Sequence, residues 1–134
     1  MKHEHKYIQL WIKKTYSEKY NIEAEIDKQN KLPDAARRWY QPDVIIRNKN
    51  GEIKYIIEVE NDPVRKAIVG ASILADASLK ALNGNAKLYF VIYDQEGIRQ
   101  IHNFRAKAEI AKRYCYNINE INVVSFEEFK NKNL

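Results

Sequence analysis

The segment PDVIIRNKNGEIKYIIEVE, residues 42–60, decides how this chain folds. Two runs of β-branched and aromatic residues flank Asn50–Gly51, and Asn-Gly between such runs is the strongest short signal of a β-hairpin. If these two residues form the loop, positions whose numbers sum to 101 face each other. This register places Asp43 opposite Glu58. Because side chains alternate along a strand, Glu60 then lies on the same face as Glu58.

The hairpin therefore carries a predicted patch of three carboxylates on an otherwise apolar surface. Like charges this close repel and cannot all stay ionised without help. A divalent cation is the usual help, because hard cations such as Mg²⁺ take carboxylate oxygens as ligands. An alternative stays open, in which Asp43 and Glu58 are strand-end carboxylates paired with Arg47 or Lys54, and Glu60 is a surface carboxylate.

Working outward from the hairpin, the chain reads as a single α/β domain over residues 1–134. Apolar periodicity and turn signals predict the remaining elements. Helices are expected over 4–20, 63–82, 97–115 and 126–132, and strands at 21–27, 43–48, 53–60, 87–93 and 121–124. A long polar connection is expected over 28–41. Both faces of the hairpin strands are apolar, so we expect the hairpin at the centre of a mixed sheet of four or five strands, flanked by helices.

Composition narrows the class of protein. Hydrophobic residues make up 45% of the chain and charged residues 31%, as in ordinary globular proteins. No apolar run approaches 18 residues and the first six residues are polar, so neither a membrane span nor a signal peptide is expected. The single cysteine, Cys115, fits a reducing, cytoplasmic setting and is interpreted as a small buried hydrophobe. The net charge of +5 suits a polyanionic partner.

The element order and two motifs carry a family resemblance. Pro42–Asp43 opens the second expected strand, and Glu58–Val59–Glu60 ends the third. This pattern resembles the PD-(D/E)xK nuclease superfamily, which has the restriction-endonuclease-like fold. The resemblance covers roughly residues 4–93 as an αβββαβ core and leaves a C-terminal αβα extension. It implies a nuclease that hydrolyses phosphodiester bonds of DNA with Mg²⁺ or Mn²⁺.

The resemblance also implies roles for individual residues. Asp43 and Glu58 are the implied metal ligands. The lysine slot of the family holds Glu60 in this chain, and some restriction-type members are similar in having Glu-x-Glu there. Glu60 would then hold the nucleophilic water or a second metal. Glu4 resembles the first-helix glutamate that some members point at the metal; the alternative is a helix-start glutamate favoured by the dipole. Lys66 is a candidate for a migrated lysine.

Candidate nucleic-acid contacts come from two basic clusters. One combines arginines with aromatic rings that can stack on bases, in Arg37, Arg38, Trp39 and Tyr40. The other lies on the late helix, in Arg105, Lys107, Lys112 and Arg113. Solvated surface is the alternative for both. A homodimer is expected, because cutting a duplex needs two strands hydrolysed and this domain carries one candidate site.

Two other functions remain open. One is a non-catalytic nucleic-acid-binding domain on a degenerate nuclease fold, and the other is an interaction domain with no nucleic-acid role. The remaining polar residues are interpreted as structural: His3 and His5 as a frayed terminus, His102 as a surface residue, and Glu23 and Glu25 as a solvated strand face.

Overall fold

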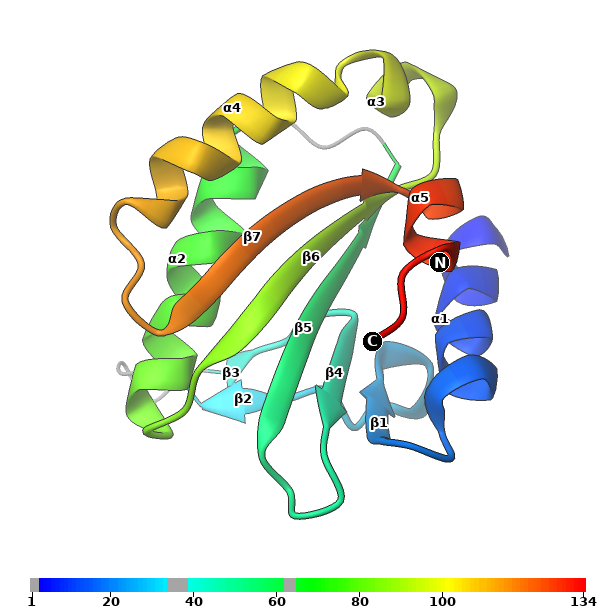
Figure 1. The fold of residues 1–134 in the computed structure, drawn as a ribbon, viewed down its shortest axis with the longest axis vertical. Coiled ribbons are helices and arrows are strands. Elements are labelled where there is room, and N and C mark those ends of the chain that lie inside the picture. The colour runs from blue at the N-terminus through cyan, green and yellow to red at the C-terminus, as the bar shows by residue number, and fades with distance from the viewer. Residues whose placement is uncertain (1–2, 34–38, 62–64) are drawn as a thin grey trace.

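The computed structural model describes residues 3–33, 39–61 and 65–134 (Figure 1). Five α-helices lie in these residues, at His3–Tyr16 (α1), Arg65–Ala81 (α2), Gln95–Arg99 (α3), Ile101–Lys112 (α4) and Phe126–Lys130 (α5). The main sheet has five strands, at Asn21–Ala24 (β1), Val44–Arg47 (β4), Ile53–Glu60 (β5), Ala86–Ile92 (β6) and Ile118–Ser125 (β7). A short 3₁₀ turn, Glu25–Asp27 (η1), follows β1, and the two-residue strands Leu32–Pro33 (β2) and Trp39–Tyr40 (β3) pair with each other.

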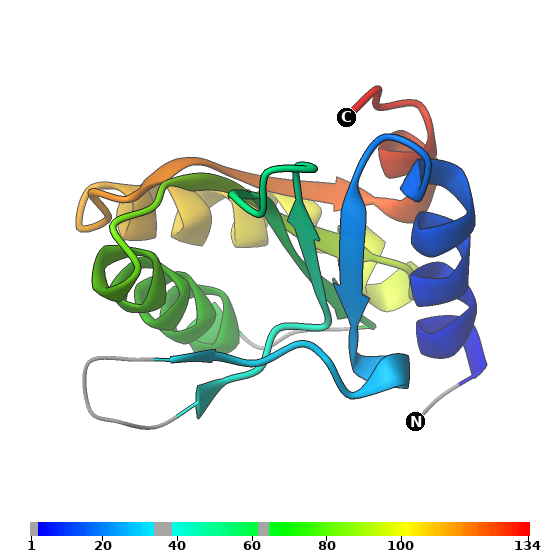
Figure 2. The ribbon, with the colours of Figure 1, turned by 90° about the horizontal axis from the view of Figure 1, so that it is seen from below.

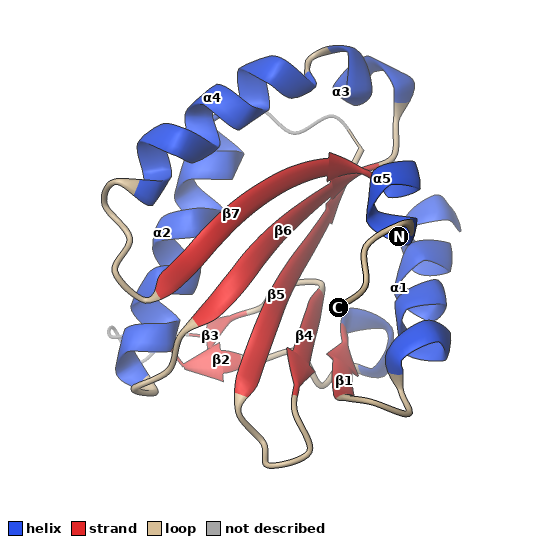
Figure 3. Ribbon diagram, in the orientation of Figure 1, coloured by secondary structure: helices blue, strands red, loops and turns tan. Residues whose placement is uncertain are grey.

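The main sheet is mixed, with the strand order β1-β4-β5-β6-β7. Strands β1, β4 and β5 form an antiparallel meander, and β5, β6 and β7 run parallel. Helix α2 connects β5 to β6, and α3 with α4 connects β6 to β7 (Figure 3). The expected mixed α/β sheet, with the hairpin strands in its interior, is confirmed.

The hairpin register is confirmed, but its loop differs from the expectation. Val44 pairs with Ile57, and the two following positions keep the same register. The register then shifts by one residue, because the turn is wider than two residues. The Asn48 side chain closes this turn by accepting hydrogen bonds from the Asn50 and Glu52 amides. Gly51 adopts a φ of +88°, which favours glycine.

Two apolar cores lie on opposite faces of the sheet. Helices α1 and α5 cover one face and helices α2 and α4 the other (Figure 2). Consecutive hairpin residues belong to different cores: Val44 packs beneath α1, and Ile45 packs beneath α2. This follows from the alternation of side chains along a strand. The hairpin is thus buried on both faces. Its carboxylates lie at one end of its strands.

Several element boundaries differ from the sequence-based expectation. The helix expected over 97–115 is two helices, because Asp94 caps an earlier start by accepting from the Glu96 amide and the chain bends at Gln100. The strand expected over 21–27 gives way to the 3₁₀ turn after Ala24. The polar connection contains the β2–β3 pair. Among the residues that the structure describes, no helix is both long and apolar enough to cross a membrane.

Candidate functional site

The three predicted carboxylates lie around one end of the hairpin. Asp43 immediately precedes β4. Glu58 and Glu60 are the third-last and last residues of β5. The Asp43 amide donates to Glu58 Oε1 at 2.9 Å, and the Val59 amide donates to Asp43 Oδ2 at 2.7 Å. The structure therefore brings Asp43 and Glu58 together through a direct backbone-to-carboxylate hydrogen bond, at the pairing that the hairpin register predicts.

Burial and mutual repulsion disfavour ionisation of this patch. Burial, followed by the negative charge of Asp43, raises the pKa of Glu58 well above its ordinary value, although the Asp43 amide opposes this. Burial and Asp43 also raise the pKa of Glu60, to about 6, while His5 opposes the rise. A carboxylate patch with raised pKa values is what crowding without a compensating cation produces.

Tyr40 completes the surroundings of Glu58. Its hydroxyl donates to Glu58 Oε2 at 3.2 Å, and its side chain is only 7% exposed. Burial, together with the charge of Glu58, raises the pKa of the Tyr40 phenol well above its ordinary value. The phenol therefore stays protonated and acts as a hydrogen-bond donor that fixes the Glu58 carboxylate.

The structure describes only some of the candidate nucleic-acid contacts. Tyr40 is a correction: its ring is buried, so it offers no stacking surface. Arg37 and Arg38 lie outside the described residues, and Trp39 is described only as a backbone partner of Pro33 in the β2–β3 pair. In the late basic cluster, Arg105 donates to the Val123 carbonyl and pairs with Glu128, so it links α4 to the end of β7 and to α5.

His5 is a second correction, because it belongs to the site and not to a frayed terminus. Helix α1 begins at His3, and its first turn reaches the end of β5. The His5 side chain is 17% exposed, with Nε2 at 2.8 Å from the Val59 carbonyl oxygen and 3.2 Å from Asp43 Oδ2. The hydrogen bond with Asp43 raises the pKa of His5, against the effect of burial.

Glu25 also joins this group, although its side chain is 41% exposed. It lies in η1, and its amide donates to the Asp43 carbonyl at 2.9 Å. Its carboxylate lies 3.7 Å from His5 Nδ1 and accepts from Gln9, which is fully buried. The solvated strand face that we expected is not found for either glutamate, because Glu23 is half-buried and pairs with Arg47, whereas Glu25 lies in η1 and accepts from Gln9.

Potential ligand atoms gather more closely here than the carboxylates alone suggest. His5, Glu25 and Asp43 each offer one ligand atom within 4.8 Å of the others. A cavity of about 200 Å³ adjoins this group and is lined by His5, Val59, Glu60, Asn61 and Tyr93. The charge of Glu4 contributes, after burial, to the raised pKa of Tyr93. Glu4 is exposed, does not line this cavity and is not among the three clustered ligands.

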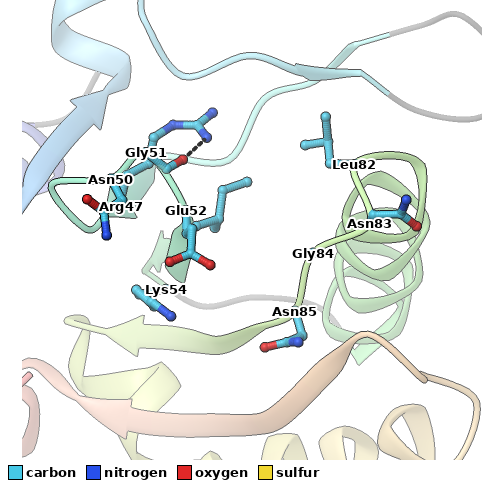
Figure 4. Close-up of a pocket in the computed structure, with 10 residues that line it drawn as sticks. Arg47, Asn50, Gly51, Glu52, Lys54, Leu82, Asn83, Gly84 and Asn85 are labelled. Carbon is cyan, nitrogen blue, oxygen red and sulfur yellow. Dashed lines mark hydrogen bonds between the residues drawn. The ribbon is translucent and has the colours of Figure 1, made fainter.

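Larger hollows lie elsewhere and carry no such cluster. One of about 350 Å³ lies between the hairpin loop and the end of α2 (Figure 4). Arg47 reaches across part of it to the Gly51 carbonyl. It opens at the start of β5, whereas the carboxylates lie at the end of the same strand.

Sequence reasoning missed His5, although a signal was present. His5 lies three residues before Ile8 and seven before Ile12, so it shares the apolar face of α1. Glu25 and Tyr93 gave no comparable signal, because their approach to Asp43 depends on how separate strands pair. Lys66 lies in α2, where only its backbone is described.

Comparisons of this chain with protein-family models, with curated proteins and with solved structures found no match.

Proposed function

We propose that this protein is a metal-dependent nuclease that hydrolyses phosphodiester bonds of DNA, with Asp43 and Glu58 as ligands of Mg²⁺ or Mn²⁺. The observation that carries the proposal is the part-buried Asp43–Glu58 pair at the end of the central hairpin, with Glu60 beside it. The arrangement of α1, three antiparallel strands, α2 and a parallel fourth strand is similar to the αβββαβ core that the sequence resemblance implies.

The chemistry of the donor set suits a hard divalent cation. Each Glu58 oxygen accepts one hydrogen bond and keeps a second lone pair for a ligand. Among the residues that the structure describes, no lysine or arginine forms an ion pair with Asp43, Glu58 or Glu60. Arg47, one of the expected alternative partners, binds Glu23 and the hairpin loop instead. His5 pairs with Asp43, and the negative charge that remains on the patch is left for a cation to neutralise.

The chain's own residues have separable roles in this proposal. A divalent cation at such a site polarises the scissile phosphate and lowers the pKa of a bound water. Asp43 and Glu58 would hold it, and Tyr40 keeps the Glu58 carboxylate in place. Glu60, with a pKa of about 6, is suited to accept the proton of the attacking water near neutral pH. It would do so from the position that holds lysine in the family pattern.

Cleavage assays on single-stranded, duplex and branched DNA, with Mg²⁺ and with Mn²⁺, test the proposal. Asp43→Asn should abolish metal-dependent cleavage, because it removes a charged ligand while nearly keeping the side chain's shape. Glu120→Gln is the matched control: it removes the same charge from an exposed ion pair with Lys87. Wild-type cleavage left intact by Asp43→Asn would refute the proposal.

The second candidate is a non-catalytic nucleic-acid-binding domain, and the observation that favours it is Glu60 in place of lysine. In that case the protein retards DNA in a salt-dependent gel shift and leaves it uncut with either metal. Glu60→Lys restores the family's usual residue, so cleavage gained by this variant alone would favour the degenerate site over the active one.

A further inference from the structure

We infer that this protein forms a symmetric homodimer through the outer surface of α2 and α4, with the two α2 helices antiparallel and Leu74 at the two-fold axis. The exposed apolar side chains of these helices support the dimer, and the carboxylates play no part in it. Both the surface and the partner therefore go beyond the proposed function and do not depend on it. A dimer of this kind carries two copies of the candidate site.

Helix α2 is apolar on its outer face as well as on the face that packs against the sheet. Its only charged residues between positions 67 and 81 are Asp76 and Lys80. Asp76 is buried and accepts from the Asn117 amide at 2.6 Å, so Lys80 alone places a charge on the outer face. A surface helix normally carries polar residues there, whereas a helix that is apolar all round is buried. The outer face is nevertheless exposed at Ala67, Gly70, Ile73, Leu74 and Ala81.

Helix α4 and the segment after it extend this apolar surface. The two helices pack side by side on the same face of the sheet (Figure 1 and Figure 2). Ile110 in α4 and Tyr114 just after it are exposed. The Cys115 thiol donates to the Ser72 carbonyl at 3.8 Å, which holds this segment against the middle of α2. Tyr114 and Tyr116, on either side of Cys115, therefore border the outer face of α2.

The large exposed side chains of these helices form a surface of the size that a dimer needs. They are Ile73, Leu74, Ile110, Tyr114 and Tyr116, and we call them the α2–α4 surface. Their exposed fractions lie between 40% and 89%, which leaves on the order of 600 Å² open, whereas monomeric proteins rarely expose more than a few hundred Å² of contiguous apolar surface. A standard interface buries about 800 Å² per partner, which the small residues of α2 and a polar rim would complete.

The residue sizes along α2 favour a second copy of this chain as the partner. Leu74 is exposed at the centre of the helix, and Ala67 and Ala81 lie seven residues before and after it. In an antiparallel pair with its axis at Leu74, Ala67 faces the partner's Ala81, and Leu74 faces its own counterpart. A two-fold interface requires this kind of self-complementarity. Repeats of seven residues also keep one stripe of a helix facing its partner along its length.

Charges lie away from the proposed axis. Lys80 is six residues from Leu74, or about 9 Å along the helix. In the antiparallel pair the partner's Lys80 lies equally far on the other side, so the two lysines are about 18 Å apart along the helix, beyond the screening length of about 8 Å at physiological salt. The centre therefore offers apolar contact without repulsion between like charges. A nucleic acid would need cations at this centre, and residues 67–81 place none there.

Light scattering and sedimentation equilibrium of the metal-free protein test the dimer. The wild type should be dimeric, and Leu74→Arg should weaken association by about a hundredfold or more, because it would bury an unpaired charge at the axis. Leu10→Arg is the matched control, since Leu10 in α1 is 47% exposed and Leu74 is 48% exposed. This variant should remain dimeric. Both positions are exposed, so far-ultraviolet circular dichroism should show the same fold in all three proteins.

Disulfide trapping tests the register of the two helices. Leu74→Cys should cross-link to itself under mild oxidation, because this position meets its own counterpart across the axis. Ala67→Cys and Ala81→Cys should each stay uncross-linked, and the variant that carries both substitutions should form a covalent dimer. Cys115 is buried and is present in every variant, so the oxidised wild type gives the background.

A monomeric wild-type protein, or a dimer that Leu74→Arg leaves intact, would overturn the proposed interface. Ala67→Cys that cross-links by itself would indicate parallel helices and overturn the register. These measurements use neither DNA nor a metal ion, so their failure leaves the nuclease proposal standing. Conversely, DNA left uncut by a protein that passes both tests would remove the nuclease and leave the dimer.

Discussion

Asp43 is the residue at which the contacts of the site converge. Its amide binds Glu58, its carbonyl accepts from the Glu25 amide, and its carboxylate binds the Val59 amide and His5. The same residue is thus part of the hydrogen bonding that ends the hairpin and the source of charge that raises the pKa values of its neighbours. Substitutions at this position can separate these two contributions.

Asp43→Asn should leave the metal-free protein as stable as the wild type, or more stable by on the order of 1 kcal/mol. The amide oxygen can still accept from Val59, and the charge that repels Glu58 and Glu60 is gone. Asp43→Ala removes the acceptor as well and should lower the free energy of unfolding by about 1–3 kcal/mol. Urea denaturation in a chelator at pH 7.5 compares the two, and equal losses of stability would contradict this account.

Glu60 should make stability fall as the pH rises. Its pKa is about 6 in the fold against an ordinary value of 4.5, so the folded protein holds the proton more tightly than the unfolded chain. That stabilisation is complete below pH 4.5 and is lost as the pH rises through 6, a difference of about 2 kcal/mol. Glu60→Gln should match the wild type at pH 4.5 and exceed it in stability at pH 7.5.

Urea denaturation of metal-free protein across this pH range provides the measurement. His5 has a raised pKa as well and acts in the same direction, so the quantity to compare is the difference between wild type and Glu60→Gln. Glu120→Gln, which removes an exposed carboxylate, should follow the wild-type pH profile. A Glu60→Gln profile parallel to that of the wild type would show that the Glu60 environment differs from the one described.

For individual residues, the sequence predicted the carboxylates of the hairpin as one group. It missed the side chains that approach this group from other parts of the chain. The approach of Asp43 to Glu58 follows from strand register, which Asn-Gly and the alternation of Ile and Val specify. The burial of Tyr40 could not be predicted, because the polar connection around it gives no periodic pattern. Glu25 approaches His5 only because the chain leaves β1 in a 3₁₀ turn.

At the scale of elements, α3 is fixed against the end of the hairpin. Gly97 is buried in this helix, and a β-carbon built on it would overlap the Asn61 carbonyl oxygen and the Ile92 side chain. Asn61 directly follows Glu60. The absence of a side chain at Gly97 therefore lets α3 approach the strand that carries the carboxylates.

Gly97→Ala should destabilise the protein by about 1–3 kcal/mol, since neither the backbone nor Ile92 can yield freely. Gly70→Ala is the control: the glycine lies in α2 with nothing within 4 Å of the added β-carbon. There, the higher helix propensity of alanine should stabilise by about 0.5–1 kcal/mol. Thermal unfolding followed by circular dichroism measures both, and a neutral Gly97→Ala would disprove the tight approach.

The sequence predicted the presence of the helices and strands better than the residues at which they begin and end. The hairpin strand 53–60 was predicted to the residue, because apolar faces and turn residues agree there. The break between α3 and α4 was missed: amphipathic periodicity continues across Gln100, and the cap at Asp94 is a local hydrogen bond that competes with it. The expected start of the helix over 63–82 lies outside the described residues.

The whole molecule depends on both cores, one on each face of the sheet. Phe129 in α5 is fully buried and makes edge-on ring contacts with Trp11 of α1 and Tyr89 of β6. It therefore joins the end of the chain to its first helix through the sheet. Because β6 also faces the other core, loss of this contact should affect the molecule as one unit.

Phe129→Ala should lower the free energy of unfolding by about 3–5 kcal/mol. Tryptophan fluorescence, which includes the signal of Trp11, and far-ultraviolet circular dichroism should give coincident urea transitions. Phe126→Ala is a milder control, because that ring is only half-buried. Separate transitions for the two signals would show that the α1 and α5 face unfolds independently of the rest.

The overall architecture could be predicted because its signals are spread along the chain. Alternating and continuous apolar runs identify the strands, and an antiparallel meander followed by a helical crossover restricts the order in the sheet. The packing of α1 on the sheet was expected as well. The sequence did not predict that this packing brings His5, in the first turn of α1, to the candidate site.

The partners of His5 lie far along the chain from α1. His5 is separated by 54 residues from Val59, and the face of the sheet on which α1 packs includes β6 and α5. During synthesis His5 therefore has no partner until Val59 has been made, and closing so long a loop costs entropy before any contact compensates for it. Translation thus delays the approach of His5 to Asp43 and Val59 until the whole hairpin has emerged.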